Sequence, residues 1–379
     1  MATSVRLAPV QVDYLNFIRA AAAQIVLIGH ASGYFMAGME RDGHLETFGV
    51  LVFFLLSGFL ITSSVLQKLG RPDYGFGHYL IDRFCRIFAG YVPALLFVAV
   101  VDATLRVLPN YPYAASSGPL TWFGNLFMLQ EFPVFQILRR LGMPEQSWFI
   151  EAFGSGRPFW TVAIEWWLYL SFGYLVFRIV QRRRFGLAEA AILALFGIVP
   201  LYNAMGGVGH CLTFVWALGA GAAFIRHKLG DLAAAPQMRW IWAGSLLLSL
   251  AGLGGHVLAM GFQVYELQFA IFTGAALFSL FFLLGSLGIG LPKPASAVVN
   301  RFADYSYSLY LTHFTVLIWF ALRMPAPDHR SPLTMAALIV TANVIALGFW
   351  FLFERHYPLL ARQAKAALDR RHLPQPARA

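Results

Sequence analysis

Long apolar runs recur along the whole chain, with short polar connections between them. A helix needs about 17–25 such residues to cross roughly 30 Å of hydrocarbon. Ten runs meet this length, at about 14–36, 46–68, 86–107, 158–181, 187–203, 208–227, 239–258, 264–286, 303–323 and 333–354. The pattern predicts an all-α integral membrane protein, a bundle of about ten transmembrane helices.

Composition supports this prediction. Of the 379 residues, 59% are hydrophobic and 12% are charged, whereas soluble domains carry about 25% charged residues. The first run is too long for a cleaved signal peptide and contains Arg19, so we expect it to stay as the first helix.

The net charge of +10 raises the question of a nucleic-acid partner. If the N-terminus is cytoplasmic and ten spans follow, 20 of the 28 lysine and arginine residues fall in inner segments and seven in outer ones. This asymmetry follows the positive-inside rule. It predicts that both termini are cytoplasmic, and it explains the basic charge without nucleic acid.

Residues 1–358 are predicted to form one transmembrane domain, followed by a basic, partly disordered cytoplasmic tail at 359–379. An outer segment at about 108–157 contains Trp122 and Trp148. It either shapes a site for a large partner or rests on the bundle as amphipathic helices. We find no internal repeat, which disfavours an inverted-repeat transporter. Two cysteines on opposite sides of the membrane suggest neither a disulfide nor a metal cluster.

Arg19 and His30 are ionisable residues inside the first predicted span. Their separation of eleven residues is close to three helical turns, which places them on one face roughly 16 Å apart. A charge near the bilayer centre costs at least about 2.5–3.5 kcal/mol, so such residues indicate function. A histidine is suited to general-base chemistry near neutral pH. The alternative is that His30 bonds a backbone carbonyl and Arg19 extends to the interface.

Arg83 and Arg86 lie three residues apart at the inner end of the third span. They are neighbours on a helix face, and paired guanidinium groups suit a phosphate-bearing ligand. Ordinary flanking charge is the alternative, and these two residues alone favour it.

Further polar residues lie within other spans. Glu165, inside the fourth span, must be paired or protonated there. It would neutralise Arg19 or orient His30, and a purely structural ion pair is equally compatible. Ser306, Tyr310 and His313 form one stripe of the ninth span, which lines a wet tunnel or joins helices. Ser57 and Gly58 in the second span permit close helix packing.

Together these segments resemble the acyltransferase-3 family of bacterial integral-membrane acyltransferases. Two departures are Asn16, where the family usually has aspartate, and Ala89-Gly90, where proline is common. The motifs that carry the resemblance are Leu15 to Arg19 with His30, Phe53 to Phe59, Arg83 with Arg86, Trp160 to Glu165, Ser306 to His313, and Glu354 to Pro358.

The resemblance implies a multi-pass protein of the bacterial cytoplasmic (inner) membrane, of the stand-alone type without a hydrolase-like domain. It would move an acyl group, usually acetyl, from cytoplasmic acyl-CoA to a hydroxyl of a glycan or lipid-linked saccharide. Acyl-CoA would be a substrate, with no bound cofactor and no metal.

Roles for the candidate residues follow from the same resemblance. Arg83 and Arg86 would bind the donor phosphates, and His30 would be the general base or carry the acyl group. Arg19 and Glu165 would complete the catalytic set. Ser57, Ser306, Tyr310 and His313 would line or support the passage. A transporter or flippase using the same polar face is the competing interpretation.

Overall fold

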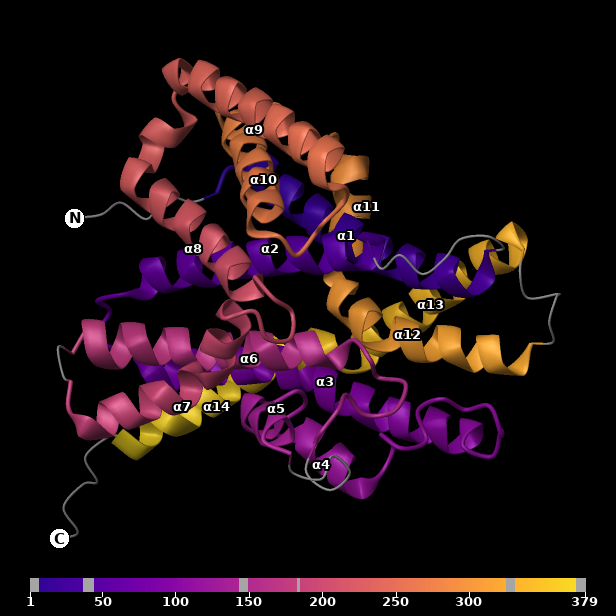
Figure 1. Ribbon diagram of the computed structural model, residues 1–379. Helices are drawn as coiled ribbons and strands as arrows, with labels where there is room; N and C mark the ends of the chain where they lie inside the picture. The colour runs from indigo at the N-terminus through magenta and orange to yellow at the C-terminus, as the bar shows by residue number, and fades with distance from the viewer. Residues whose placement is uncertain (1–6, 37–43, 143–148, 183–184, 325–330, 373–379) are drawn as a thin grey trace, which may run out of the picture.

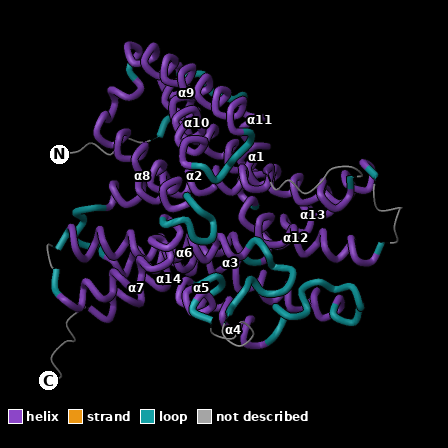
Figure 2. Tube along the Cα trace, viewed as in Figure 1, coloured by secondary structure: helices purple, strands orange, loops and turns teal. Residues whose placement is uncertain are grey.

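The computed structural model describes residues 7–36, 44–142, 149–182, 185–324 and 331–372, and its regular structure within these ranges is entirely helical (Figures 1 and 2). The prediction of an all-α fold is confirmed. The helices are α1 (Pro9–Phe35), α2 (His44–Lys68), α3 (Phe76–Leu105), α4 (Pro119–Leu126), α5 (Pro133–Arg140), α6 (Phe159–Tyr174), α7 (Leu187–Ala204), α8 (Leu212–Leu229), α9 (Arg239–Met260), α10 (Leu267–Leu287), α11 (Lys293–Asp304), α12 (Ser306–Arg323), α13 (Pro332–Leu352) and α14 (Tyr357–His372).

Each of the ten predicted spans corresponds to a helix. Within the described residues, eight stretches are long and apolar enough to cross a membrane. The two predicted spans that fall short are α8 and α12. Residues 308–318 of α12 are all buried. A helix enclosed by protein does not face lipid, so it can carry polar side chains at low cost.

Several boundaries differ from the prediction. α3 begins at Phe76, ten residues before the predicted start at 86. The prediction missed its first turns because they carry His78 and Asp82, which pair with residues of other helices. α11 was not predicted, and a break at Tyr305 separates it from α12. The tail forms a helix to His372. Trp148 lies outside the described residues.

The close approach predicted at Gly58 is present between α2 and α8. A β-carbon added at Gly58 would lie 1.9 Å from the carbonyl oxygen of Trp216, and one added at Gly219 would lie 2.0 Å from that of Leu55. The two glycines therefore allow backbone-to-backbone contact, as small residues do between membrane helices.

Side-chain contacts distinguish the two ends of the bundle. At one end, Asp82 near the start of α3 pairs with Lys68 of α2 (3.1 Å) and Lys365 of α14 (2.7 Å). At the other end, Asp102 near the end of α3 accepts a hydrogen bond from Ser155 Oγ (2.6 Å) in the outer segment. α14 thus lies at the same end of the bundle as Lys68. The charge pattern assigns this end to the cytoplasm.

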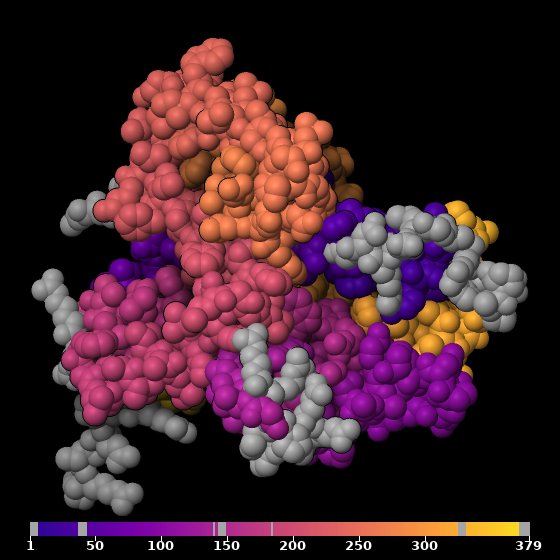
Figure 3. All heavy atoms as spheres, viewed as in Figure 1, coloured from indigo at the N-terminus to yellow at the C-terminus, as the bar shows by residue number. Residues whose placement is uncertain are grey.

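α8, α9 and α10 form a lobe at the upper edge of the molecule (Figures 1 and 3). Large apolar side chains of α9 are exposed there, including Leu248 (74%) and Leu258 (90%). This surface suits contact with lipid. The polar residues described next lie among α1, α2, α3, α6 and α12.

Candidate functional site

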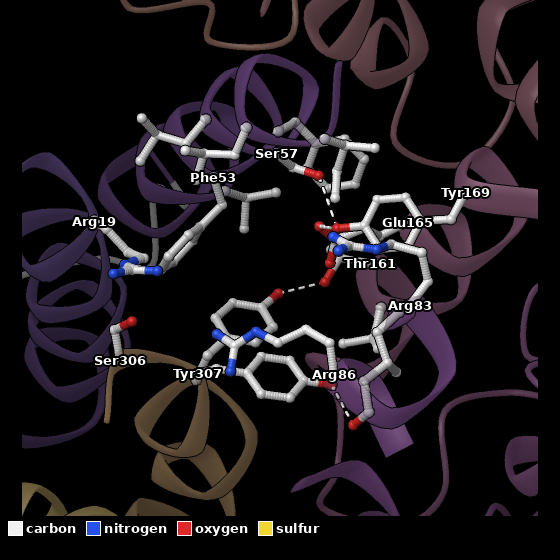
Figure 4. Close-up of a pocket in the computed structure, with 18 residues that line it drawn as sticks. Arg19, Phe53, Ser57, Arg83, Arg86, Thr161, Glu165, Tyr169, Ser306 and Tyr307 are labelled. Atoms are coloured by element: carbon white, nitrogen blue, oxygen red, sulfur yellow. Dashed lines mark hydrogen bonds between the residues drawn. The ribbon is translucent and has the colours of Figure 1, made fainter. Parts of the chain in front are cut away.

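A cavity of about 170 Å³ lies among α1, α2, α3, α6 and α12 (Figure 4). This is smaller than the roughly 300–1,000 Å³ typical of pockets for drug-sized ligands, so it suits a slender part of a larger molecule. Seven of the nine predicted site residues line it: Arg19, Ser57, Arg83, Arg86, Glu165, Ser306 and Tyr310. Five helices distant in sequence therefore bring the predicted motifs to one place.

Arg19 enters the cavity from α1 and is held by an amide. Its Nη2 donates to Oδ1 of Asn16 (2.7 Å), and Nδ2 of Asn16 donates to Asn300 of α11 (2.7 Å). Nε of Arg19 is buried without a partner. Asn16 stands where the family usually has aspartate, and a neutral amide orients the guanidinium without neutralising its charge. Arg19 therefore keeps a charge that can attract an anionic ligand.

Arg86 is fixed by an ion pair. Its Nη1 lies 2.5 Å from Oε1 of Glu354, whose side chain is 1% exposed. Glu354 also accepts hydrogen bonds from the backbone N–H (3.0 Å) and Oγ (2.5 Å) of Ser308. The guanidinium lies near the ring of Tyr357, 4.9 Å from its centroid. Glu354 already offsets the charge of Arg86, so Arg83 and Arg86, which the sequence analysis paired as candidates for donor phosphates, differ in their surroundings.

Arg83, unlike Arg86, is not held by any carboxylate that the structure describes. It lies 5.9 Å from the centroid of the Tyr79 ring, and its Nε is buried without a hydrogen-bond partner. Across the described residues, neither Arg83 nor Arg19 forms an ion pair. Figure 4 shows the guanidinium groups of Arg19, Arg83 and Arg86 arranged around the cavity. With Glu354 offsetting Arg86 and a single carboxylate, Glu165, in the lining, the cavity favours an anionic ligand.

Glu165 does not take either role expected from the sequence. It forms no ion pair with Arg19 and does not bond His30, and instead accepts a short hydrogen bond from the Tyr169 hydroxyl. Tyr169 lies 2.9 Å from Ser57 Oγ, to which the Trp216 indole donates (3.2 Å). An indole N–H can only donate. The hydrogen bonds therefore run in one direction, from Trp216 through Ser57 and Tyr169 to Glu165. This row of hydrogen bonds ends on a carboxylate oxygen at the cavity wall.

His30 and His313 form a pair, with 3.0 Å between Nδ1 of His30 and Nε2 of His313. Nδ1 of His313 lies 2.9 Å from the carbonyl oxygens of both Leu309 and Tyr310. Carbonyl oxygens only accept, so Nδ1 of His313 carries a proton, and in the neutral ring Nε2 accepts from His30. In the neutral form of His30 the proton then lies on Nδ1 and the lone pair on Nε2. His313 thereby fixes both the orientation and the tautomer of His30.

The histidine pair lies beside the cavity and is not among the residues that line it. Tyr310 lies between the two: it lines the cavity, and its ring centroid is 6.0 Å from that of His313. The Tyr310 hydroxyl is 2.5 Å from Thr161 Oγ1, and Phe53 packs edge-on against its ring at 5.6 Å. Tyr310 therefore connects the histidine pair to the cavity that the arginines line.

The outer segment packs onto the bundle close to the histidines. Asp102 accepts from both N (2.8 Å) and Oγ (2.6 Å) of Ser155, and Ser155 Oγ lies 2.9 Å from Thr315 Oγ1. Thr315 is two residues beyond His313 on α12. Phe314, between them in sequence, packs edge-on against His30 at 4.9 Å. These hydrogen bonds place Ser155, from the outer segment, next to the turn of α12 that follows His313.

Sequence reasoning placed Glu354 in a motif and assigned no role to Glu354 or Tyr169. A carboxylate directly after an apolar span was the available signal for Glu354. Cys85 and Cys211 are both free thiols. No group of three or more potential metal ligands occurs among the residues that the structure describes.

The chain resembles known proteins along most of its length. The sequence profile of a family described as an acyltransferase domain, acyltransferase-3, matches residues 12–354. Nodulation protein 10 of Rhizobium leguminosarum bv. viciae is 24% identical over 322 residues, covering 80% of this chain and 82% of that protein. No solved structure matches the chain.

Proposed function

This chain belongs to the acyltransferase-3 family of membrane-bound acyltransferases, and from that premise we propose that it transfers an acyl group, acetyl by default, from acyl-CoA to a hydroxyl of a glycan or lipid-linked saccharide. The observation that carries this proposal is the position of an arginine-rich cavity next to an oriented histidine pair. The bacterial inner membrane is the proposed location, with the cavity facing the cytoplasm.

The donor would enter at the end of the bundle where Arg83 and Arg86 lie. Coenzyme A carries phosphates, and guanidinium groups bind phosphate through charge-assisted hydrogen bonds. Arg83 would supply the main attraction, since Glu354 offsets the charge of Arg86. Arg19 would meet the part of the donor that reaches deepest into the cavity. The small cavity volume suits the slender thioester arm.

His30 would act as general base on the acceptor hydroxyl. Its Nε2 would take the hydroxyl proton as the oxygen attacks the thioester carbonyl. The new C–O bond forms, the C–S bond breaks, and the proton passes to the departing thiolate. His313 is a positioning residue that holds His30 in the productive tautomer. Transfer through an acyl group carried by His30 is the alternative route.

The function is tested with membranes that contain the protein and acetyl-CoA labelled in its acetyl group. We expect label to appear on cell-surface or lipid-linked saccharide, measured by mass spectrometry of the glycans. Membranes lacking the protein provide the background. Movement of saccharide across the membrane without transfer of label would instead favour the transporter or flippase.

Arg83→Ala is expected to raise the KM for acyl-CoA about 10–100-fold, since a hydrogen bond to a charged group contributes about 1.5–3 kcal/mol. The KM for the acceptor should stay unchanged, because Arg83 lies on the donor side of Tyr310. Arg178→Ala is the matched control, an exposed arginine at the end of the fourth span that does not line the cavity. Equal loss of donor and acceptor binding would contradict a phosphate-binding role.

A further inference from the structure

A second concave site lies on the outside of the bundle, where α13 ends beside α11. The groove has an apolar floor with Leu347, Phe351 and Leu352, which are 38%, 52% and 62% exposed. Arg301 of α11 and Arg355, which follows α13, also line it. None of these residues lines the donor cavity. The groove therefore needs an explanation of its own.

The groove lies at the end of the bundle assigned to the cytoplasm. Asp13, near the start of α1, accepts a hydrogen bond from Ser296 of α11 (2.6 Å), and Asn16 bonds Asn300 (2.7 Å). These bonds hold α11 beside the first turns of α1. Trp350, which lines the groove, is a residue type enriched where membrane meets water. A groove at this end of the bundle would lie at the level of the lipid headgroups.

Both arginines in the groove can bind an additional ligand. Arg301 lies 5.4 Å from the centroid of the Trp350 ring and, within the described residues, forms neither a hydrogen bond nor an ion pair. Arg355 Cζ lies 3.5 Å from the centroid of the Phe351 ring, and Nε of Arg355 donates to Nε2 of His356 (3.3 Å). Asp304 is one turn from Arg301 but does not pair with it. Two guanidinium groups therefore flank an apolar floor without compensation.

The apolar floor of the groove also leaves open space beside the two arginines. A β-carbon added at Gly348 would meet no atom within 4 Å. A hydrocarbon chain can follow this space along α13 while a phosphate lies between the two guanidinium groups. Basic pockets at the cytoplasmic side of membrane helices recognise anionic headgroups.

We propose that this groove binds an anionic phospholipid of the cytoplasmic leaflet, with its phosphate at Arg301 and Arg355 and one acyl chain over Gly348. A zwitterionic phospholipid provides no net charge for these arginines, so the groove should discriminate against it.

The test is native mass spectrometry of the full chain in detergent with added phosphatidylglycerol or phosphatidylcholine. We expect phosphatidylglycerol to bind more tightly than phosphatidylcholine. Arg301→Gln with Arg355→Gln should weaken phosphatidylglycerol binding about 25-fold, from about 1 kcal/mol for each arginine near the membrane surface. Gly348→Phe, which fills the floor and leaves both charges, should also weaken it.

Arg323→Gln is the matched control. Arg323 also lies over a tryptophan, 5.1 Å from the centroid of the Trp319 ring, but at the opposite end of the bundle. It should not change binding. Three results would overturn the proposal: equal affinity for both lipids, unchanged binding in the double variant, or release of the lipid by coenzyme A. The last would assign the groove to donor phosphates. None of these depends on acyl transfer, so the proposal and the proposed function fail separately.

Discussion

Replacing His30 by alanine is expected to lower the rate of acyl transfer by about 10²–10⁴-fold, the usual contribution of a general base. The reason is the arrangement of the pair: in the proposed mechanism His313 accepts from Nδ1 of His30, and Nε2 of His30 would take the acceptor proton. The KM for acyl-CoA should change little, because His30 does not line the donor cavity. The measurement is the steady-state rate at saturating labelled acyl-CoA, with membrane insertion checked for each variant.

His313→Gln separates positioning from proton transfer. Glutamine lacks the ring that fixes the His30 tautomer, so we expect a smaller loss of rate and an altered dependence of the rate on pH. Gln24→Ala is a control on α1, because Gln24 contacts Asn343 of α13 and not the histidines. If the His30→Ala variant kept nearly full activity while inserting normally, the catalytic role of His30 would be excluded.

Much of the fold could be predicted because lipid imposes a simple rule on sequence. Spans must be apolar and about 20 residues long, and all ten predicted spans correspond to helices. The rule is less reliable for a helix that is surrounded by protein and not by lipid. α12 is enclosed and polar, and α11 is a short amphipathic helix, so their separation at Tyr305 left no clear hydropathy signal.

The residues of the site could be predicted better than their partners. Seven of the nine candidates line one cavity, since buried ionisable side chains are rare and conspicuous in apolar spans. Their pairing depends on helix packing between segments far apart in sequence. His30 and His313 are 283 residues apart, and Arg86 and Glu354 are 268 apart. Spacing along one helix could not reveal either contact.

Glu354→Ala is expected to reduce stability by about 3–5 kcal/mol, the usual cost of removing one partner from a buried ion pair. The substitution leaves the guanidinium of Arg86 uncompensated and removes the acceptor for both the backbone N–H and Oγ of Ser308. Ser308 lies near the start of α12, the helix that carries Tyr310 and His313. We therefore expect a lower midpoint of thermal unfolding, measured in detergent, together with loss of transfer activity.

Glu151→Ala provides the matched control for that loss of stability. Glu151 also pairs with an arginine, Arg157 (2.9 Å), but the two side chains are 45% and 36% exposed. Exposed ion pairs contribute about 0–1 kcal/mol, so the unfolding midpoint should move little. Combining Glu354→Ala with Arg86→Met removes the uncompensated charge, and we expect it to recover part of the lost stability but not donor binding. If Glu354→Ala unfolded at the same temperature as Glu151→Ala, the ion pair with Arg86 would not anchor α12.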